Sequence, residues 1–152
     1  MQARLRKMLS LHEGRIPHAY QDSLGYWTIG VGHLIDKRKG GRLPEEIIDA
    51  LLDYDIKAHT RPLYEALPWL HRLDEVRQAV LCDMAFNLGV NGLLKWKNTL
   101  RFVEQGDYSR AAAAMRSSLW ARQVKSRAVR LVKMMETGQW PKEITDGEGP
   151  EV

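Results

Sequence analysis

The sequence contains only one cysteine, Cys82, and its amino terminus has no uninterrupted apolar run long enough for a signal peptide or a membrane span. A disulfide within the chain is therefore excluded, and the apolar helical pattern around Cys82 predicts burial as a small hydrophobic residue. There is no internal repeat and no low-complexity tract. The 152 residues are enough for one domain, or for one domain in two lobes, with a core that folds without disulfides.

The sequence also lacks the short motifs of metal and nucleotide sites. Its five histidines form no HExxH or closely paired motif, and one cysteine provides too few thiolates for a zinc site. The glycines of "TIGVGH", residues 28–33, form neither GxxxxGK nor GxGxxG followed by a helix. Nothing in the sequence around Cys82 indicates a nucleophile. We therefore expect neither a metal nor an organic cofactor.

The chain is basic, with 23 Lys and Arg against 19 Asp and Glu, a net charge of +4 at pH 7 and a pI near 9.3. Such a charge favours an anionic partner, for which nucleic acid, acidic lipid and the bacterial wall are candidates. The basic residues gather in "RSSLWARQVKSRAVRLVK", residues 116–133, with apolar residues between them. This pattern favours a packed amphipathic helix with its charged side in solvent, and a nucleic-acid face is the alternative.

The first third of the chain mixes helix and strand signals. A short helix that stops at Gly14 is predicted by the helical spacing of Leu5, Met8, Leu9 and His12. "HAY", the turn-like "QDSLG" and "YWTIGVGH" together predict a β-hairpin, because aromatic and β-branched residues flank a turn. The following apolar pattern predicts a long helix that begins at Pro44 and ends at Pro62.

From Leu63 onward the sequence indicates successive helices and almost no strand. Asp74 and Asp107 are expected to start helices, and helices are expected to stop at Gly89, Gly92, Gly106 and Gly138. The fold class is therefore α+β, with a small amino-terminal hairpin lobe joined by the long helix to a larger helical lobe. Within a single domain of residues 1–152, we expect a mixed lobe of residues 14–60, a helical lobe of residues 1–13 and 61–142, and a tail of residues 143–152.

Two carboxylates occupy different local settings near the amino terminus. Glu13 falls in the last turn of its helix, where the helix dipole disfavours negative charge, and Asp22 falls in the hairpin turn. These settings favour a protonated Glu13 and an ionised Asp22, the division of roles that glycosidic cleavage needs. Glu and Asp residues nine positions apart are common, so the spacing alone leaves coincidence open.

The same stretch resembles the catalytic signature of the phage-type lysozymes of glycoside hydrolase family 24. "HEG" at residues 12–14 is followed by Asp22, then after five residues by Thr28, and then by "IGVGH" at residues 29–33. The resemblance extends to residues 79–102, similar to the family's central helix and following segment, and to residues 117–140, similar to its carboxyl-terminal helices. The region 36–42 is shortened relative to the family.

This resemblance implies a two-lobe, lysozyme-like fold whose cleft binds peptidoglycan. Glu13 would be the general acid, Asp22 would activate the attacking water, and Thr28 would orient that water. The products would be inverted, which requires about 6.5 to 9.5 Å between the carboxylates. Arg127 matches the arginine that pairs with the catalytic glutamate, and a solvated helix residue is the alternative. His33 is interpreted as a residue whose hydrogen bond holds the loop.

Four further positions resemble sugar-contacting residues of the family, namely Leu34, Phe86, Asn87 and Thr99. Leu34 and Phe86 also suit a core. Ala114 stands where better-known members have asparagine, and His12 where relatives are often acidic, so neither the sugar contacts nor the pH optimum carries over in detail. Four of the five tryptophans lie in or beside helical patterns that favour core packing, and either Tyr26 or Trp27 is expected to face the cleft.

We therefore predict an endolysin-like, inverting muramidase that cleaves the β-1,4 bond between N-acetylmuramic acid and N-acetylglucosamine. The sequence demands no more than a monomer, and it has neither a motif for RNA or DNA recognition nor an apolar run for stable membrane insertion, so we expect no nucleic acid partner. The family resemblance implies that the protein stays in the host cytoplasm until a holin-type pore releases it. The alternatives are a lytic transglycosylase, which would not need Asp22 and Thr28, and a non-catalytic wall-binding module. Binding to the anionic wall is expected to weaken as salt rises.

Overall fold

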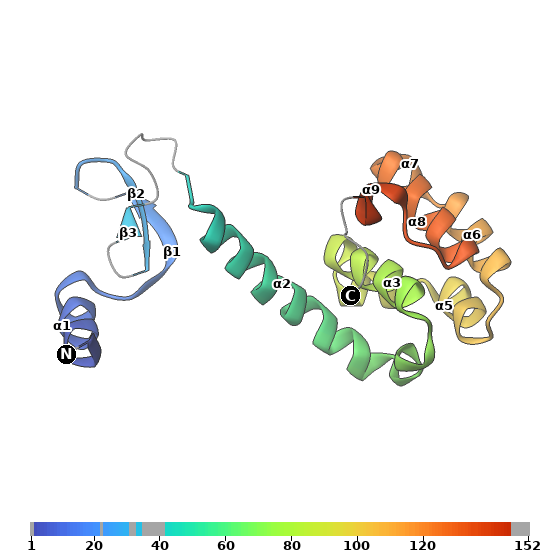
Figure 1. Cartoon of the computed structure of the whole chain (residues 1–152), viewed down its shortest axis with the longest axis horizontal. Helices are drawn as coiled ribbons and strands as arrows, with labels where there is room; N and C mark the ends of the chain where they lie inside the picture. The colour runs from blue at the N-terminus through green and yellow to red at the C-terminus, as the bar shows by residue number, and fades with distance from the viewer. Residues whose placement is uncertain (1, 22, 31–32, 35–41, 147–152) are drawn as a thin grey trace. The chain divides into compact units, whose positions relative to one another are not determined.

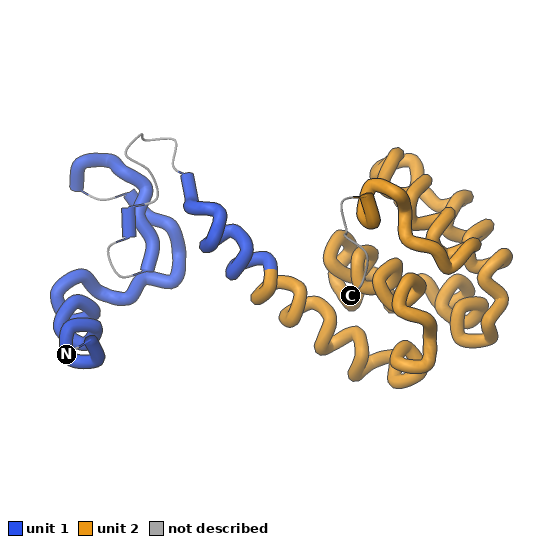
Figure 2. The backbone as a smooth tube through the Cα atoms, in the orientation of Figure 1, with its two compact units in different colours: residues 1–52 blue, residues 53–152 orange. Residues whose placement is uncertain are grey.

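The computed structural model describes residues 2–21, 23–30, 33–34 and 42–146 (Figure 1). Contacts divide the chain into two compact units, residues 1–52 and 53–152 (Figure 2). The predicted lobe boundaries depend on how these units are placed, so they stay a prediction. The predicted α+β class is confirmed, since a small antiparallel sheet near the amino terminus is followed by helices.

The first unit contains a helix, a hairpin and a short third strand. Helix α1 (Gln2–Glu13) ends where predicted, because Gly14 adopts a φ of +76°. Strands β1 (Ile16–Gln21), β2 (Trp27–Gly30) and β3 (His33–Leu34) form an antiparallel sheet in the order β1-β2-β3. The predicted hairpin is therefore confirmed, and β2 is the central strand.

Helix α2 (Glu45–Ala66) begins after Pro44, as predicted, but does not end at Pro62. That prediction is wrong: the helix continues through the proline for another turn. Proline lacks the amide proton of a helical hydrogen bond, at a cost of about 3 kcal/mol in a helix interior. The last turn is retained because Leu63 and Leu67 are buried in the helical core and the Leu67 amide donates to the Leu63 carbonyl at 2.9 Å.

The second unit is helical in its described part. After α2 come the 3₁₀ helix η1 and seven α-helices, namely η1 (Pro68–Arg72), α3 (Glu75–Leu88), α4 (Val90–Leu94), α5 (Lys97–Glu104), α6 (Tyr108–Arg116), α7 (Leu119–Val124), α8 (Ser126–Thr137) and α9 (Lys142–Thr145). The predicted caps are confirmed, since Asp74 accepts from the Arg77 amide at 3.0 Å and Asp107 from the Arg110 amide at 3.2 Å. No described helix is long and apolar enough to cross a membrane.

Three of the four predicted glycine stops are confirmed. Gly89, Gly106 and Gly138 follow helices and have positive φ angles. Gly92 does not stop a helix but lies inside α4, so that prediction is wrong. The helix stops instead at Gly89, whose backbone conformation ends α3 before α4 begins.

The core of the second unit forms where α8 packs against α3 and α6, and α6 also packs against α5. Its fully buried side chains include Leu81 and Met84 of α3, Met115 of α6 and Met135 of α8. Trp120 of α7 is 4% exposed and meets Trp96 edge to face, with 5.5 Å between the ring centroids. Two tryptophans differ from this pattern, since Trp27 and Trp140 are each 37% exposed. The expectation of core packing is therefore wrong for Trp140.

Arg77 of α3 fastens the carboxyl end of α8. Its Nε donates to the Met135 carbonyl at 2.8 Å, and its Nη2 donates to the Glu136 carbonyl at 3.0 Å. The guanidinium also lies 3.7 Å from the centre of the Tyr108 ring. These contacts satisfy carbonyls that have no partner within the helix, and they fix the end of α8 on α3.

Replacement of Gly138 should therefore cost more stability than replacement of a comparable glycine. A Cβ at Gly138 would lie 2.5 Å from Arg77 Nη1, whereas a Cβ at Gly106 would have no neighbour within 4 Å, although both residues have positive φ. We expect Gly106→Ala to lower the free energy of unfolding by about 1 kcal/mol, and Gly138→Ala by about 2 to 3 kcal/mol. Urea unfolding of the two variants measures the difference, and equal losses would contradict it.

Candidate active site

Glu13 is the last residue of α1 and is exposed. The helix stops behind it because the Gly14 amide donates to the Ser10 carbonyl at 3.0 Å while Gly14 takes the left-handed conformation. A residue with a Cβ would be strained at that position. The turn therefore holds Glu13 at the boundary between α1 and the segment that leads into β1.

Thr28 lies on the central strand of the sheet and is 5% exposed. It is paired with Tyr20 on β1 and with Leu34 on β3. Its hydroxyl donates to the Tyr26 carbonyl at 3.2 Å. Because a hydroxyl has one proton and two lone pairs, this bond leaves the Thr28 oxygen as an acceptor.

The other predicted residues of the first unit are less defined. Asp22 lies outside the described residues, so the separation of the two carboxylates stays a prediction. His33 and Leu34 lie on β3, and Leu34 is 42% exposed, which argues against a core role within this unit. The proposed loop-holding bond of His33 stays a prediction.

In the second unit, one face of α3 carries two of the predicted residues, Phe86 and Asn87, together with Asp83. Asp83, Phe86 and Asn87 follow the spacing i, i+3, i+4, which places them on the same side of the helix. Arg127 of α8 joins this face: its Nε donates to Asp83 Oδ1 at 2.8 Å and its Nη2 to the Asp83 carbonyl at 3.2 Å. Arg127 is therefore tied to α3 rather than free in solvent.

Phe86 and Asn87 are both held by neighbours. The Phe86 side chain is 38% exposed, and its ring centroid lies 5.0 Å from that of His59 on α2. The Asn87 Oδ1 accepts from the indole nitrogen of Trp120 at 2.8 Å. Since an indole can only donate, this bond fixes which end of the amide faces Trp120 and turns the amide nitrogen away from it.

Thr99 differs from the other predicted sugar contacts. It lies in α5 and is 5% exposed. Burial of this degree is typical of a packing residue, so its contact with a sugar stays a prediction.

Sequence reasoning missed three residues that hold the predicted ones in place, namely His59, Asp83 and Trp120. The contacts of His59 and Trp120 join residues far apart in the chain, and no local pattern indicates them. Asp83 could have been predicted from the sequence, because it lies four residues before Asn87 and therefore on the same face of the helix.

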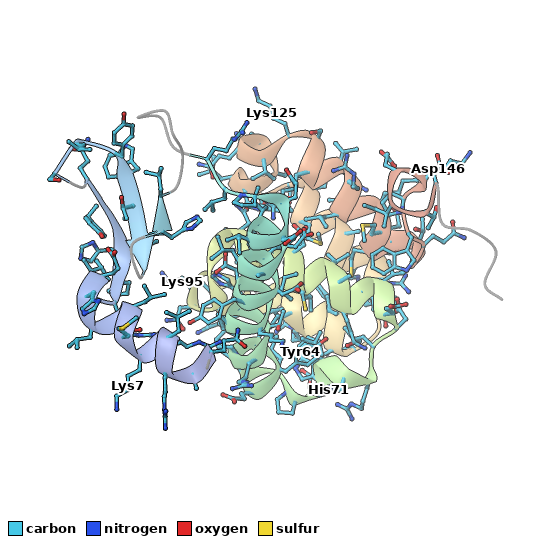
Figure 3. The ribbon with its side chains drawn as sticks, turned by 60° about the vertical axis from the view of Figure 1, so that its left-hand side comes forward. Lys7, Tyr64, His71, Lys95, Lys125 and Asp146 are labelled. Carbon is cyan, nitrogen blue, oxygen red and sulfur yellow. The ribbon has the colours of Figure 1, made fainter. Side chains whose placement is uncertain are left out.

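Cys82 and Tyr64 pack in contact with each other against the core. Tyr64 is labelled in Figure 3. The Tyr64 hydroxyl donates to Gln78 Oε1 at 2.6 Å, and the Cys82 Sγ lies 4.0 Å from the Tyr64 hydroxyl. Burial raises the pKa of Tyr64 to about 12, and burial also raises the pKa of the Cys82 thiol. A nucleophilic cysteine needs a lowered pKa, so the structure supports a packing role for Cys82.

In the described part of the chain, no group of three or more His, Cys, Asp or Glu side chains is arranged to hold a metal ion. The model of the phage lysozyme family matches residues 10–135. The chain belongs to the phage lysozyme family. This phage lysozyme is accordingly a glycosidase that hydrolyses peptidoglycan, and the resemblance in its sequence is confirmed.

Three relatives illustrate the range of the family. The probable T4-type lysozyme 1 of Dictyostelium discoideum is 31% identical over 165 residues, covering 91% of this chain and 96% of that protein. The pre-baseplate central spike protein Gp5 of Enterobacteria phage T4 is 31% identical over 165 residues, covering 88% of this chain and 28% of the spike protein. An endolysin of Acyrthosiphon pisum secondary endosymbiont phage 1 is 29% identical over 106 residues, covering 70% of each chain.

The raised pKa of Tyr64 predicts a loss of stability at high pH. A tyrosine in the unfolded chain ionises near its usual pKa of 10.0, whereas Tyr64 in the native protein keeps its proton to about pH 12. Between these values unfolding releases a proton, so the free energy of unfolding falls as pH rises. We expect wild type to lose about 1 to 2 kcal/mol more than Tyr64→Phe between pH 9 and pH 12. Urea unfolding followed by tryptophan fluorescence measures this, and identical pH profiles for the two proteins would contradict it.

Proposed function

We propose that this phage lysozyme cleaves the β-1,4 bond between N-acetylmuramic acid and N-acetylglucosamine with inversion. Glu13 is the general acid, Asp22 the general base, and Thr28 orients the attacking water. The observation that carries the proposal is the order of these three residues, with eight residues between Glu13 and Asp22 and five between Asp22 and Thr28, within the family match.

In this mechanism Glu13 gives its proton to the leaving oxygen as the bond from that oxygen to the anomeric carbon breaks. Water attacks the same carbon from the opposite face, and Asp22 accepts the proton that the water loses. The products are a free hydroxyl on one sugar and a new reducing end of inverted configuration on the other. The exposed position of Glu13 at a fixed helix end supports its role, because the acid must reach a bound polymer.

The hydrogen bond of Thr28 supports its role with the water. Since the hydroxyl proton is given to the Tyr26 carbonyl, the Thr28 oxygen can accept a hydrogen from water and cannot compete for the water's lone pairs. The lone pair that attacks the sugar is then directed away from Thr28. Burial on the central strand of the sheet holds the hydroxyl in place.

The α3 face supports a role in binding the sugar chain. We propose that Phe86 and Asn87 contact the substrate together with Leu34 and Thr99, and that Arg127 pairs with Glu13. The Asn87 amide nitrogen, turned away from Trp120, can donate to a sugar oxygen. Asp83 offsets part of the charge of Arg127 and holds its side chain on this face.

We further propose that the protein lyses a bacterial host. It would act as a monomer, remain in the host cytoplasm until a holin-type pore admits it to the wall, and bind neither nucleic acid nor the membrane interior. The similarity to an endolysin supports this role. The similarity to a phage central spike protein supports a second candidate, in which the lysozyme belongs to a phage particle.

The reaction is tested by mass spectrometry and NMR of fragments released from purified peptidoglycan. We expect reducing-end muramic acid whose anomeric configuration is α when first formed. We expect Glu13→Gln to lower kcat by about 10² to 10⁴-fold without loss of fold, because only the transferable proton is removed. A folded Glu13→Gln variant with wild-type kcat would overturn the assignment of the acid, and predominantly anhydro ends would overturn the role of Asp22.

Thr28 is tested by two substitutions of similar size. Thr28→Val removes the hydroxyl and should lower kcat by about 10 to 100-fold with little change in KM, whereas Thr28→Ser keeps the hydroxyl and should retain most of kcat. Circular dichroism controls for folding, since Thr28 is buried. Equal losses in both variants would indicate that Thr28 only packs the sheet.

A further inference from the structure

A groove of about 380 Å³ lies between α6, α7 and α8 in the second unit. Its apolar floor is formed by Ala121 and the buried Ala128 and Val132, and the groove is also lined by Val129, which is 71% exposed. Four basic side chains surround this floor, namely Arg116, Arg122, Lys125 and Lys133, with Glu136 as the one acidic residue of the lining. The groove therefore combines an apolar surface with an excess of positive charge.

The positive charge extends into a second groove. An adjoining groove of about 580 Å³ shares Val129 and Lys133 and adds Arg130, Lys142 and Glu143. Together the two grooves hold six of the 23 basic residues and two of the 19 acidic residues, which leaves 17 of each sign elsewhere. The two grooves therefore carry a net charge of +4, equal to that of the whole chain, and such a surface attracts a polyanion.

Three of these cations are available to a ligand. Arg116 pairs with Glu136 at 3.5 Å and Arg130 pairs with Glu143 at 3.8 Å, and both pairs are exposed. Within the described residues, Arg122, Lys125 and Lys133 form no ion pair. A carboxylate that enters the groove can therefore meet a cation without first breaking an internal pair.

The backbone conformation of Lys125 is a second, independent observation about this groove. It connects α7 to α8 with φ +49° and ψ −110°, and it is the one non-glycine residue with positive φ in the described ranges. Glycine would adopt a positive φ more easily, so the lysine is retained at a cost in backbone strain. Figure 3 shows the Lys125 side chain extending outward from the helices, where it can reach a ligand.

We propose that this groove binds the acidic peptides attached to the sugar chains of peptidoglycan. Their carboxylates pair with Arg122, Lys125 and Lys133, and their aliphatic parts cover the apolar floor. A phosphate group alone would use the cations and leave the floor in water. The inference rests on the proposed function, because peptidoglycan is the substrate, and the residues that line the groove belong to the second unit.

The test measures binding of the full chain to purified peptidoglycan sacculi by sedimentation. All proteins carry Glu13→Gln, so that the wall is not digested during the measurement. The groove variant is Arg122→Gln, Lys125→Gln and Lys133→Gln. The control variant is Lys57→Gln, Arg61→Gln and Arg72→Gln, which removes the same charge from exposed residues elsewhere in the second unit. Each protein is tested on untreated sacculi and on sacculi whose carboxyl groups have been amidated.

We expect the groove variant to bind untreated sacculi about tenfold more weakly than its parent, and the control variant to stay within about twofold. Amidation of the sacculi should weaken binding of the parent by about the same tenfold, and parent and groove variant should then bind equally. Equal losses in both variants would overturn the proposal in favour of general charge attraction. Undiminished binding after amidation would also overturn it, as would groove-dependent binding only to vesicles of equal phosphatidylglycerol and phosphatidylcholine.

Lys125→Gly provides a separate check, because it relieves the backbone strain while removing the cation. We expect this variant to be at least as stable as its parent in urea and yet to bind sacculi about two- to threefold more weakly. A gain of stability with unchanged binding to sacculi would show that Lys125 does not contribute to the proposed site. Failure of the groove proposal is distinguishable from failure of the proposed reaction. Binding is measured on proteins that carry Glu13→Gln, whereas the reaction is measured by the reducing ends that the unsubstituted chain releases.

Discussion

The helical unit depends on the way two arginines fasten α8 across α3. Near the amino end of α8, Arg127 binds the side chain and carbonyl of Asp83. Near the carboxyl end, Arg77 of α3 binds the carbonyls of Met135 and Glu136. Between these points Ala128 and Leu131 are buried. Two directional contacts at opposite ends prevent α8 from sliding or turning, which apolar packing alone would resist less specifically.

Once α8 is fixed, its two sides serve different purposes. On one side Arg127 completes the α3 face with Phe86 and Asn87. On the other, Val129 and Lys133 separate the two basic grooves. The same helix therefore connects the proposed sugar contacts with the proposed peptide contacts, and a shift of α8 would disturb both. This arrangement explains how a stretch with a strong positive charge can also be a core element.

The sequence predicted those features that local chemistry determines. Asp74 and Asp107 cap helices through their own side chains, and Gly14 and Gly138 end helices because they accept positive φ, so each signal lies within a few residues of its effect. The order of Glu13, Asp22 and Thr28, on which the proposed reaction depends, is also contained in one short stretch of sequence. The prediction that α2 ends at Pro62 was wrong because burial of Leu63 and Leu67 outweighs the lost hydrogen bond. That burial depends on residues distant in the chain. The partners of Asn87 and Arg127 lie 33 and 44 residues away, beyond the reach of any local pattern.

The hydrogen bond between Trp120 and Asn87 determines which end of the Asn87 amide the α3 face presents. Held by an indole that can only donate, the amide presents hydrogen to a ligand and keeps its oxygen turned inward. Carbonyl and hydroxyl oxygens find a partner there, whereas a protonated amine meets another donor. If Asn87 contacts the sugar chain as proposed, its amide nitrogen suits the acetyl oxygen of an acetylated sugar better than the ammonium group of a deacetylated one. The buried ring of Trp120 would in this way make the proposed contact sensitive to deacetylation of the wall.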